Sequence, residues 1–119
     1  MIRYILVVDT SKLIRRIMVD ALEDFGYTVV GEADSGKEAL AQYKLLKPDL
    51  VIMNLVLPDI SGVELIQRIH NIDSQAKVIV CSSCQEKQII YQAIQAGAAD
   101  FLIKPFNIEK FKELVIKLA

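Results

Sequence analysis

Residues 50–66 read LVIMNLVLPDISGVELI. Four consecutive apolar residues at its start are typical of a strand that is buried on both faces. Asn54 ends the apolar run, Pro58 and Asp59 are a turn signal, and Ser61 precedes a segment with helical periodicity. The stretch therefore predicts a buried strand, a short loop and a helix, in that order.

The same strand-then-helix unit recurs along the chain. Apolar runs of strand length lie at 4–8, 28–32, 50–53, 78–81 and 101–103. Helical periodicity predicts a helix before Gly26 and helices at 36–46, 62–70, 86–96 and 107–118, with Ser35, Ser61 and Asn107 as N-caps. This order predicts an α/β fold in one domain, residues 1–119, with a parallel sheet covered by helices.

Two of these helices have apolar faces that should contact the sheet. In the first helix the apolar face comprises Leu13, Ile14, Ile17, Met18, Ala21, Leu22 and Phe25. In the helix at 86–96 we expect Ile90, Ala93 and Ile94 to face inward and four residues to face outward: Gln88, Tyr91, Gln92 and Gln95. An exposed tyrosine among amides fits a surface for protein contact and an ordinary solvated face equally well.

The composition excludes several classes of protein. The 119 residues suffice for one hydrophobic core, and 53% of them are hydrophobic. The 14 basic and 15 acidic residues are spread along the chain, so no dense basic run indicates a nucleic-acid partner. No apolar stretch reaches the roughly 18 residues needed to cross a bilayer. We therefore expect a packed cytoplasmic domain with no membrane segment.

Polar residues follow four of the five predicted strands. Asp9 and Thr10 follow the first strand, Asn54 the third, Ser82 the fourth and Lys104 the fifth. Ligands of open α/β sheets bind beyond the carboxyl ends of the strands, so we expect these side chains to gather at one edge. Each could simply cap the next helix, but a lysine that faces an acid there is an arrangement suited to holding an anion.

Four stretches resemble the receiver domains of two-component response regulators, particularly the single-domain chemotaxis type. They read ILVVDTS, KPDLVIMNLVLPDISGVEL, VIVCSS and QAGAADFLIKPF, and together they extend over nearly the whole chain. The resemblance implies a doubly wound, flavodoxin-like sheet of five parallel strands in the order 2-1-3-4-5, with five helices. It implies a phosphorelay signalling domain that is not an enzyme. Its partner would be a sensor kinase, a motor or output protein, or a second copy, bound through the fourth helix, fifth strand and fifth helix.

The resemblance also implies roles for individual residues. Receivers accept a phosphoryl group on an aspartate after the third strand, and Asn54 stands at that position. Ser82 corresponds to the switch hydroxyl, Lys104 to the phosphate-binding lysine and Phe101 to the aromatic switch residue.

The residues that correspond to the family's Mg²⁺ site are Asp9, Thr10, Asn54 and Val56, the last through its backbone carbonyl. Thr10 and Asn54 replace two of the three expected carboxylates, so Mg²⁺ should be weakly bound or absent. An amide is neutral and its nitrogen lone pair is delocalised, so Asn54 should not accept a phosphoryl group. We expect Lys104 to pair with Asp9 instead, and the Asn54 amide to hydrogen-bond its own loop.

Two origins of this site stay open. A single Asp-to-Asn change is the obvious way to silence a receiver by engineering. A naturally degenerate receiver explains Thr10 as well, because the site departs from the pattern twice. The second origin is favoured.

The cysteine and histidine residues do not indicate another function more strongly than that of a receiver. Cys81 and Cys84 form CSSC, which matches the spacing of thiol redox modules, although Cys81 falls within a predicted strand. His70 closes the third predicted helix, where a cation complements the helix dipole, and we expect it at the surface. Without a second histidine, a zinc site or a catalytic triad has no support.

Overall fold

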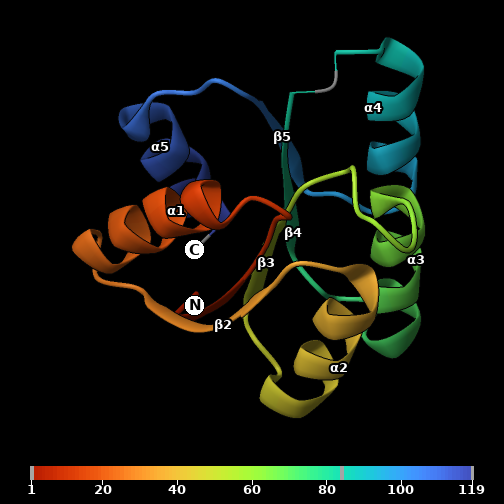
Figure 1. Ribbon diagram of the computed structural model, residues 1–119, viewed down its shortest axis with the longest axis horizontal. Helices are drawn as coiled ribbons and strands as arrows, with labels where there is room; N and C mark the ends of the chain where they lie inside the picture. Colours follow the sequence, from red (N-terminus) through yellow and green to blue (C-terminus); the bar gives the residue numbers. More distant parts are fainter. Residues whose placement is uncertain (1, 84, 119) are drawn as a thin grey trace.

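The chain folds into a five-stranded sheet with helices on both faces, as a computed structural model shows for residues 2–83 and 85–118 (Figure 1). The strands are β1 (Tyr4–Val8), β2 (Thr28–Ala33), β3 (Leu50–Met53), β4 (Val78–Ser82) and β5 (Asp100–Ile103). The helices are α1 (Lys12–Asp24), α2 (Gly36–Leu46), α3 (Gly62–Ile72), α4 (Lys87–Gln95) and α5 (Ile108–Leu118). Every strand pair is parallel and the order is β2-β1-β3-β4-β5, which confirms the predicted fold class.

The sheet separates two hydrophobic layers. Helices α1 and α5 cover one face, and α2, α3 and α4 cover the other (Figure 1). In β3, Leu50 and Ile52 pack in the layer with α1 and α5, whereas Val51 and Met53 pack in the opposite layer. Because side chains alternate along a strand, a strand covered on both faces must be apolar throughout.

The predicted N-caps and the end of α1 are confirmed, whereas α3 continues two residues beyond His70, to Ile72. The side chains of Ser35, Ser61 and Asn107 each accept a backbone hydrogen bond from the residue three positions later, at 2.7–3.1 Å. Gly26 follows the last turn of α1 with φ of 94°, a conformation that glycine adopts without strain. None of the helices described is long and apolar enough to cross a bilayer.

Two expectations about helix faces are wrong. Leu13 and Ile17 are 69% and 42% exposed on α1, and Ile94 is 52% exposed on α4. The stripe of α1 that is fully buried is narrower than its apolar face and comprises Met18, Ala21 and Leu22. On α4 only Ala93 is buried, with Ile89 packed against the same layer. The tilt of each helix on the sheet determines which apolar residues it leaves in solvent.

His70 is half-buried rather than at the surface. Its Nδ1 lies 3.1 Å from the Ile66 carbonyl oxygen, and its Nε2 lies 2.9 Å from that of Ala76. The turn after α4 packs over the ring, and a Cβ placed on Gly97 would lie 2.5 Å from the His70 Cε1. The ring therefore links the end of α3 to the segment just before β4.

Candidate functional site

Backbone hydrogen bonds join the carboxyl ends of neighbouring strands at one edge of the sheet. The Asp9 amide donates to the Ala33 carbonyl, and the Asn54 amide donates to the Val8 carbonyl, both at 3.0 Å. The Lys104 amide donates to the Ser82 carbonyl at 2.9 Å. The polar residues predicted to gather therefore lie on neighbouring strand ends.

Asp9 and Lys104 form the charged centre of this edge. Asp9 is only 2% exposed, and its Oδ2 accepts a hydrogen bond from the Lys104 Nζ at 2.5 Å. Its Oδ1 accepts a second hydrogen bond, from the Ser11 amide at 2.9 Å. Both carboxylate oxygens are thus satisfied by the protein itself, and the expected pairing is confirmed.

Arg15 is a member of the site that the sequence did not reveal. Its Nη1 donates to the Asp9 carbonyl at 2.6 Å, and its Nε donates to Glu32 Oε1 at 3.1 Å. Arg15 lies on the charged side of α1, where its pattern is that of a solvated residue. The position of β2 beside β1 brings Glu32 to the Arg15 side chain, which also holds the main chain of Asp9.

Asn54 hydrogen-bonds its own loop, as expected. Its Nδ2 donates to the Val56 carbonyl at 3.3 Å. The amide thus uses the carbonyl that the resemblance assigns to Mg²⁺. Thr10 is exposed beside this edge.

The other predicted site residues lie at the end of β4, in β5 and on α4. Ser82 is buried at the end of β4, and Phe101 is half-buried in β5, packed against the layer beneath α3 and α4. The four outward-facing residues of α4 are exposed, as expected: Gln88, Tyr91, Gln92 and Gln95.

The donor set at this edge does not fit a tightly held Mg²⁺ ion. Such ions are usually held by one or two carboxylates with waters and phosphate oxygens. Here Asp9 supplies one carboxylate, and both of its oxygens already accept hydrogen bonds. Over residues 2–83 and 85–118, no three acidic, cysteine or histidine side chains are grouped so that they could bind a metal.

Cys81 does not suit redox chemistry. It is buried in β4, and burial raises the pKa of its thiol to about 12, with Lys104 lowering it and Asp9 raising it by smaller amounts. The thiolate is the reactive form, and a thiol with this pKa is almost entirely protonated at neutral pH. Cys84, the second cysteine of the motif, lies outside the described residues.

Asp59 fixes the loop that follows Asn54. Its Oδ1 accepts a hydrogen bond from the Gly36 amide and its Oδ2 accepts one from the Lys37 amide, both at 2.8 Å. These amides belong to the first turn of α2, whose amides have no partner within the helix. They are the main reason why the pKa of Asp59 is lowered. A side chain from a distant loop thus helps to cap α2.

We predict that Asp59→Asn lowers the melting temperature at pH 7. Since the pKa of Asp59 is lowered on folding, its stabilisation is present above the ordinary value of 3.8 and is lost as the pH falls through the folded value. The difference from wild type should therefore shrink at pH 3. Asp20→Asn is the control, because Asp20 is exposed and lies 3.7 Å from Arg16. Equal effects of the two variants at pH 7 would refute the role of Asp59.

These features define a class of protein. The response regulator receiver domain matches the chain over residues 5–116, and the chain belongs to this family. It is 40% identical over 115 residues to chemotaxis protein CheY of Thermotoga maritima, covering 97% of this chain and 96% of that protein. It is 39% identical over 113 residues to CheY of Bacillus subtilis, covering 95% and 94%.

A solved structure shows the same fold. It is the crystal structure of the CheX-CheY-BeF3-Mg²⁺ complex from Borrelia burgdorferi. One chain of it aligns with a TM-score of 0.93 and 24% identity, covering 98% of this chain and 88% of that one.

Proposed function

We propose that this receiver signals by protein contact and is not switched by aspartyl phosphorylation. Asn54 carries the proposal. It follows β3, where the resemblance places the phosphoacceptor, and its neutral amide donates to the Val56 carbonyl at 3.3 Å. An acyl phosphate requires a carboxylate oxygen as the nucleophile, and an amide offers none.

The charges around Asn54 support the same function. In the role that the resemblance implies, Lys104 would bind the phosphoryl group and Ser82 would respond to it. Here the Lys104 ammonium is paired with the Asp9 carboxylate. The charges of Asp9 and Lys104 therefore cancel without a phosphoryl group or a metal cation, and Thr10 adds no charge.

A protein partner in a cytoplasmic two-component pathway, such as chemotaxis, would bind the face formed by α4, β5 and α5. On α4, Tyr91 and Ile94 are exposed next to Gln88, Gln92 and Gln95. Aromatic and apolar residues surrounded by polar ones are typical of protein interfaces. The exposure of Ile94, which was unexpected, adds apolar area to this face.

The direct test is incubation with acetyl phosphate and Mg²⁺, followed by intact mass measurement. The wild-type mass should not change, because no carboxylate stands at the acceptor position. The Thr10→Asp/Asn54→Asp variant serves as the matched control and should gain one phosphoryl group. A stable single-phosphate adduct on any carboxylate of the wild-type site would refute the proposed function.

A second prediction concerns Mg²⁺ itself. Binding measured by calorimetry should be in the millimolar range or weaker, on the order expected for a site with one carboxylate that is already engaged. The same double variant should bind Mg²⁺ at least about tenfold more tightly, because it restores two carboxylates. Micromolar binding by the wild-type protein would contradict this expectation.

A further inference from the structure

Helix α1 has an exposed outer face on the side away from the sheet. It comprises seven residues: Lys12, Leu13, Arg16, Ile17, Asp20, Glu23 and Asp24. Its apolar members, Leu13 and Ile17, lie one turn apart. Ile17 also lines a groove of about 330 Å³ between α1 and the start of α5, together with Ile14, Phe106 and Ile108. The exposed apolar residues of the outer face therefore continue into an apolar groove.

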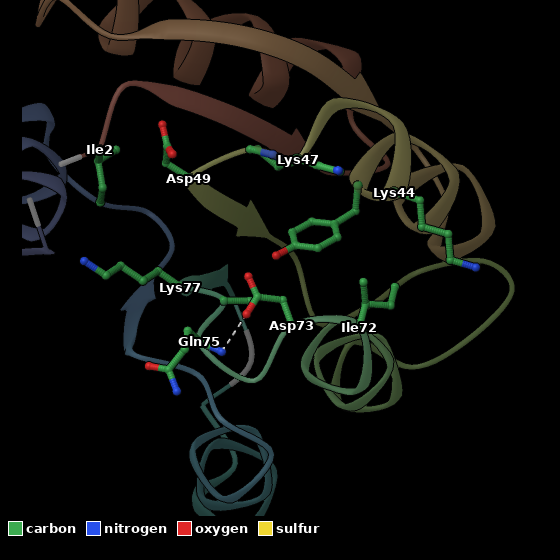
Figure 2. A pocket seen from close by; sticks show the side chains of 11 residues that line it. Ile2, Lys44, Lys47, Asp49, Ile72, Asp73, Gln75 and Lys77 are labelled. Atoms are coloured by element: carbon green, nitrogen blue, oxygen red, sulfur yellow. Dashed lines mark hydrogen bonds between the residues drawn. The ribbon is translucent and has the colours of Figure 1, made fainter.

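A pocket at the opposite edge of the sheet has a different character. It has a volume of about 600 Å³ and lies at the amino ends of β1, β3 and β4 (Figure 2). Two aspartates and three lysines interrupt its apolar lining. The groove beside α1 is lined by five apolar residues, with only Ser83 and Lys104 as polar members. Contiguous apolar surface that is exposed to water is typical of protein interfaces, and here it lies beside α1.

The charges of α1 are ordered along the helix. Its first half carries basic residues and its second half acidic ones: Lys12, Arg15 and Arg16, then Asp20, Glu23 and Asp24. This order opposes the helix dipole, which favours acidic residues in the first turn and basic residues in the last. Helices α2 and α5 each follow the favourable order, whereas α1 has neither feature. The stability of α1 by itself therefore does not account for its charges.

The same order makes the outer face of α1 complementary to itself. When two copies of the helix pack antiparallel, the basic half of each faces the acidic half of the other. A two-fold axis that passes near the middle of α1, at residue 18, produces this arrangement and places the two Ile17 side chains close to the axis. A two-fold interface requires a self-complementary surface, because both copies contribute the same residues. Parallel packing would bring like charges together.

Most charges of the outer face are available for such a contact. Within the chain, the Arg16 Nε lies 3.7 Å from the Asp20 Oδ1, and the two side chains are 77% and 63% exposed. An exposed pair at this distance contributes little to stability, so a partner can replace it at small cost. Arg15 is the exception, because it already holds the Asp9 carbonyl and Glu32.

We propose that two copies of this protein associate through the outer face of α1, packed antiparallel about a two-fold axis. Leu13 and Ile17 of both copies exclude water from the contact. The basic residues of each copy pair with the acidic residues of the other: Lys12 and Arg16 with Asp20 and Asp24. Helix α4 lies on the opposite side of the sheet (Figure 1), so the dimer leaves it accessible to another protein.

The dimer should be weak. A helix of 13 residues is about 20 Å long, so the contact falls below the roughly 1,200 Å² that stable interfaces bury. We expect a dissociation constant on the order of 100 µM, which is typical of small transient contacts. Sedimentation equilibrium between about 10 µM and 1 mM protein should therefore show an average mass that rises from that of one chain towards twice that value. Raising NaCl from about 50 to 500 mM should weaken the dimer several-fold, because salt screens exposed charges.

A pair of apolar variants tests the face. Leu13→Ser should weaken the dimer by at least about tenfold, because it removes apolar area from the contact. Leu45→Ser is the matched control, since Leu45 is 79% exposed on α2, away from α1, and should change the dissociation constant less than about twofold. Both residues are exposed, so neither change should unfold the protein.

Charge-reversal variants test the antiparallel arrangement. Lys12→Glu/Arg16→Glu makes the charges of the outer face entirely acidic, and Asp20→Lys/Asp24→Lys makes all but Glu23 basic. Each variant alone should associate at least about tenfold more weakly than wild type, because like charges meet across the axis. An equal mixture of the two should associate at least as tightly as wild type, since an acidic helix then faces a basic one. Association in the mixture also shows that both variants are folded.

Three outcomes would overturn the inference. The first is a wild-type protein that stays monomeric at about 1 mM. The second is an equal loss of association in Leu13→Ser and Leu45→Ser, which would mean that α1 is not the specific contact. The third is a mixture of the charge-reversal variants that associates no better than each variant alone. All three are independent of whether Asn54 can be phosphorylated.

Discussion

Phosphorylation is expected to return in two steps, slowly and partially in Asn54→Asp and efficiently only in Thr10→Asp/Asn54→Asp. Under the proposed function, the single variant supplies the nucleophile, but the metal site still lacks the acid that the resemblance implies at position 10. A bound Mg²⁺ ion contributes several kcal/mol of charge stabilisation to phosphoryl transfer, so the double variant should react at least about tenfold faster than the single variant. The measurement is the rate of phosphorylation by acetyl phosphate against Mg²⁺ concentration.

Melting temperatures recorded alongside provide an independent readout. Asn54→Asp places a second carboxylate near Asp9, so without metal the fold should lose roughly 1 kcal/mol or less, and Mg²⁺ should restore it. A single variant as fast as the double variant, saturating at the same Mg²⁺ concentration, would indicate an engineered knock-out instead of a naturally degenerate receiver. Failure of both variants would mean that Asn54 is not at the acceptor position.

Lys104→Met is expected to destabilise the fold by about 3 kcal/mol, because it leaves the buried Asp9 carboxylate without its counter-charge. Asp9 retains the hydrogen bond from the Ser11 amide, but that bond does not neutralise it. The Lys104 side chain is itself only 16% exposed, so water can replace the ammonium group only in part. Chemical denaturation at pH 7 measures the loss.

Two controls test whether the charge is the cause. Asp9→Asn/Lys104→Met removes both charges and should recover most of the stability, because breaking a buried pair costs more than replacing it. Lys117→Met removes a lysine that is 73% exposed and 3.7 Å from Asp100, and should cost less than about 1 kcal/mol. If Lys104→Met and Lys117→Met cost the same, the ion pair does not stabilise this edge.

Much of the fold follows from local patterns in the sequence. A strand covered on both faces must be apolar throughout, so the sequence alone predicts a buried strand at residues 50–53. Parallel strands end at a common edge, so the gathering of Asp9, Asn54 and Lys104 was predictable before any distance was known. These inferences need only the order of the elements along the chain.

What the sequence could not reveal depends on contacts between distant segments. Arg15 contacts Glu32 only because β2 lies beside β1, and Asp59 caps α2 from a loop 22 residues further on. Periodicity shows which residues share a helix face but not how the helix tilts, so the exposure of Leu13 and Ile94 was missed. His70 is covered by a turn whose position no local pattern specifies.

The Asp9–Lys104 pair bears on what determines the strength of a signal that this protein sends to its partner. Because Asp9 and Lys104 neutralise each other, these side chains reach the arrangement seen here without a phosphodonor. Under the proposed function, the fraction of partner bound would then depend on the number of copies of this protein and on their affinity, by mass action. Synthesis and degradation of the protein, instead of the activity of a kinase, would determine the strength and duration of its signal.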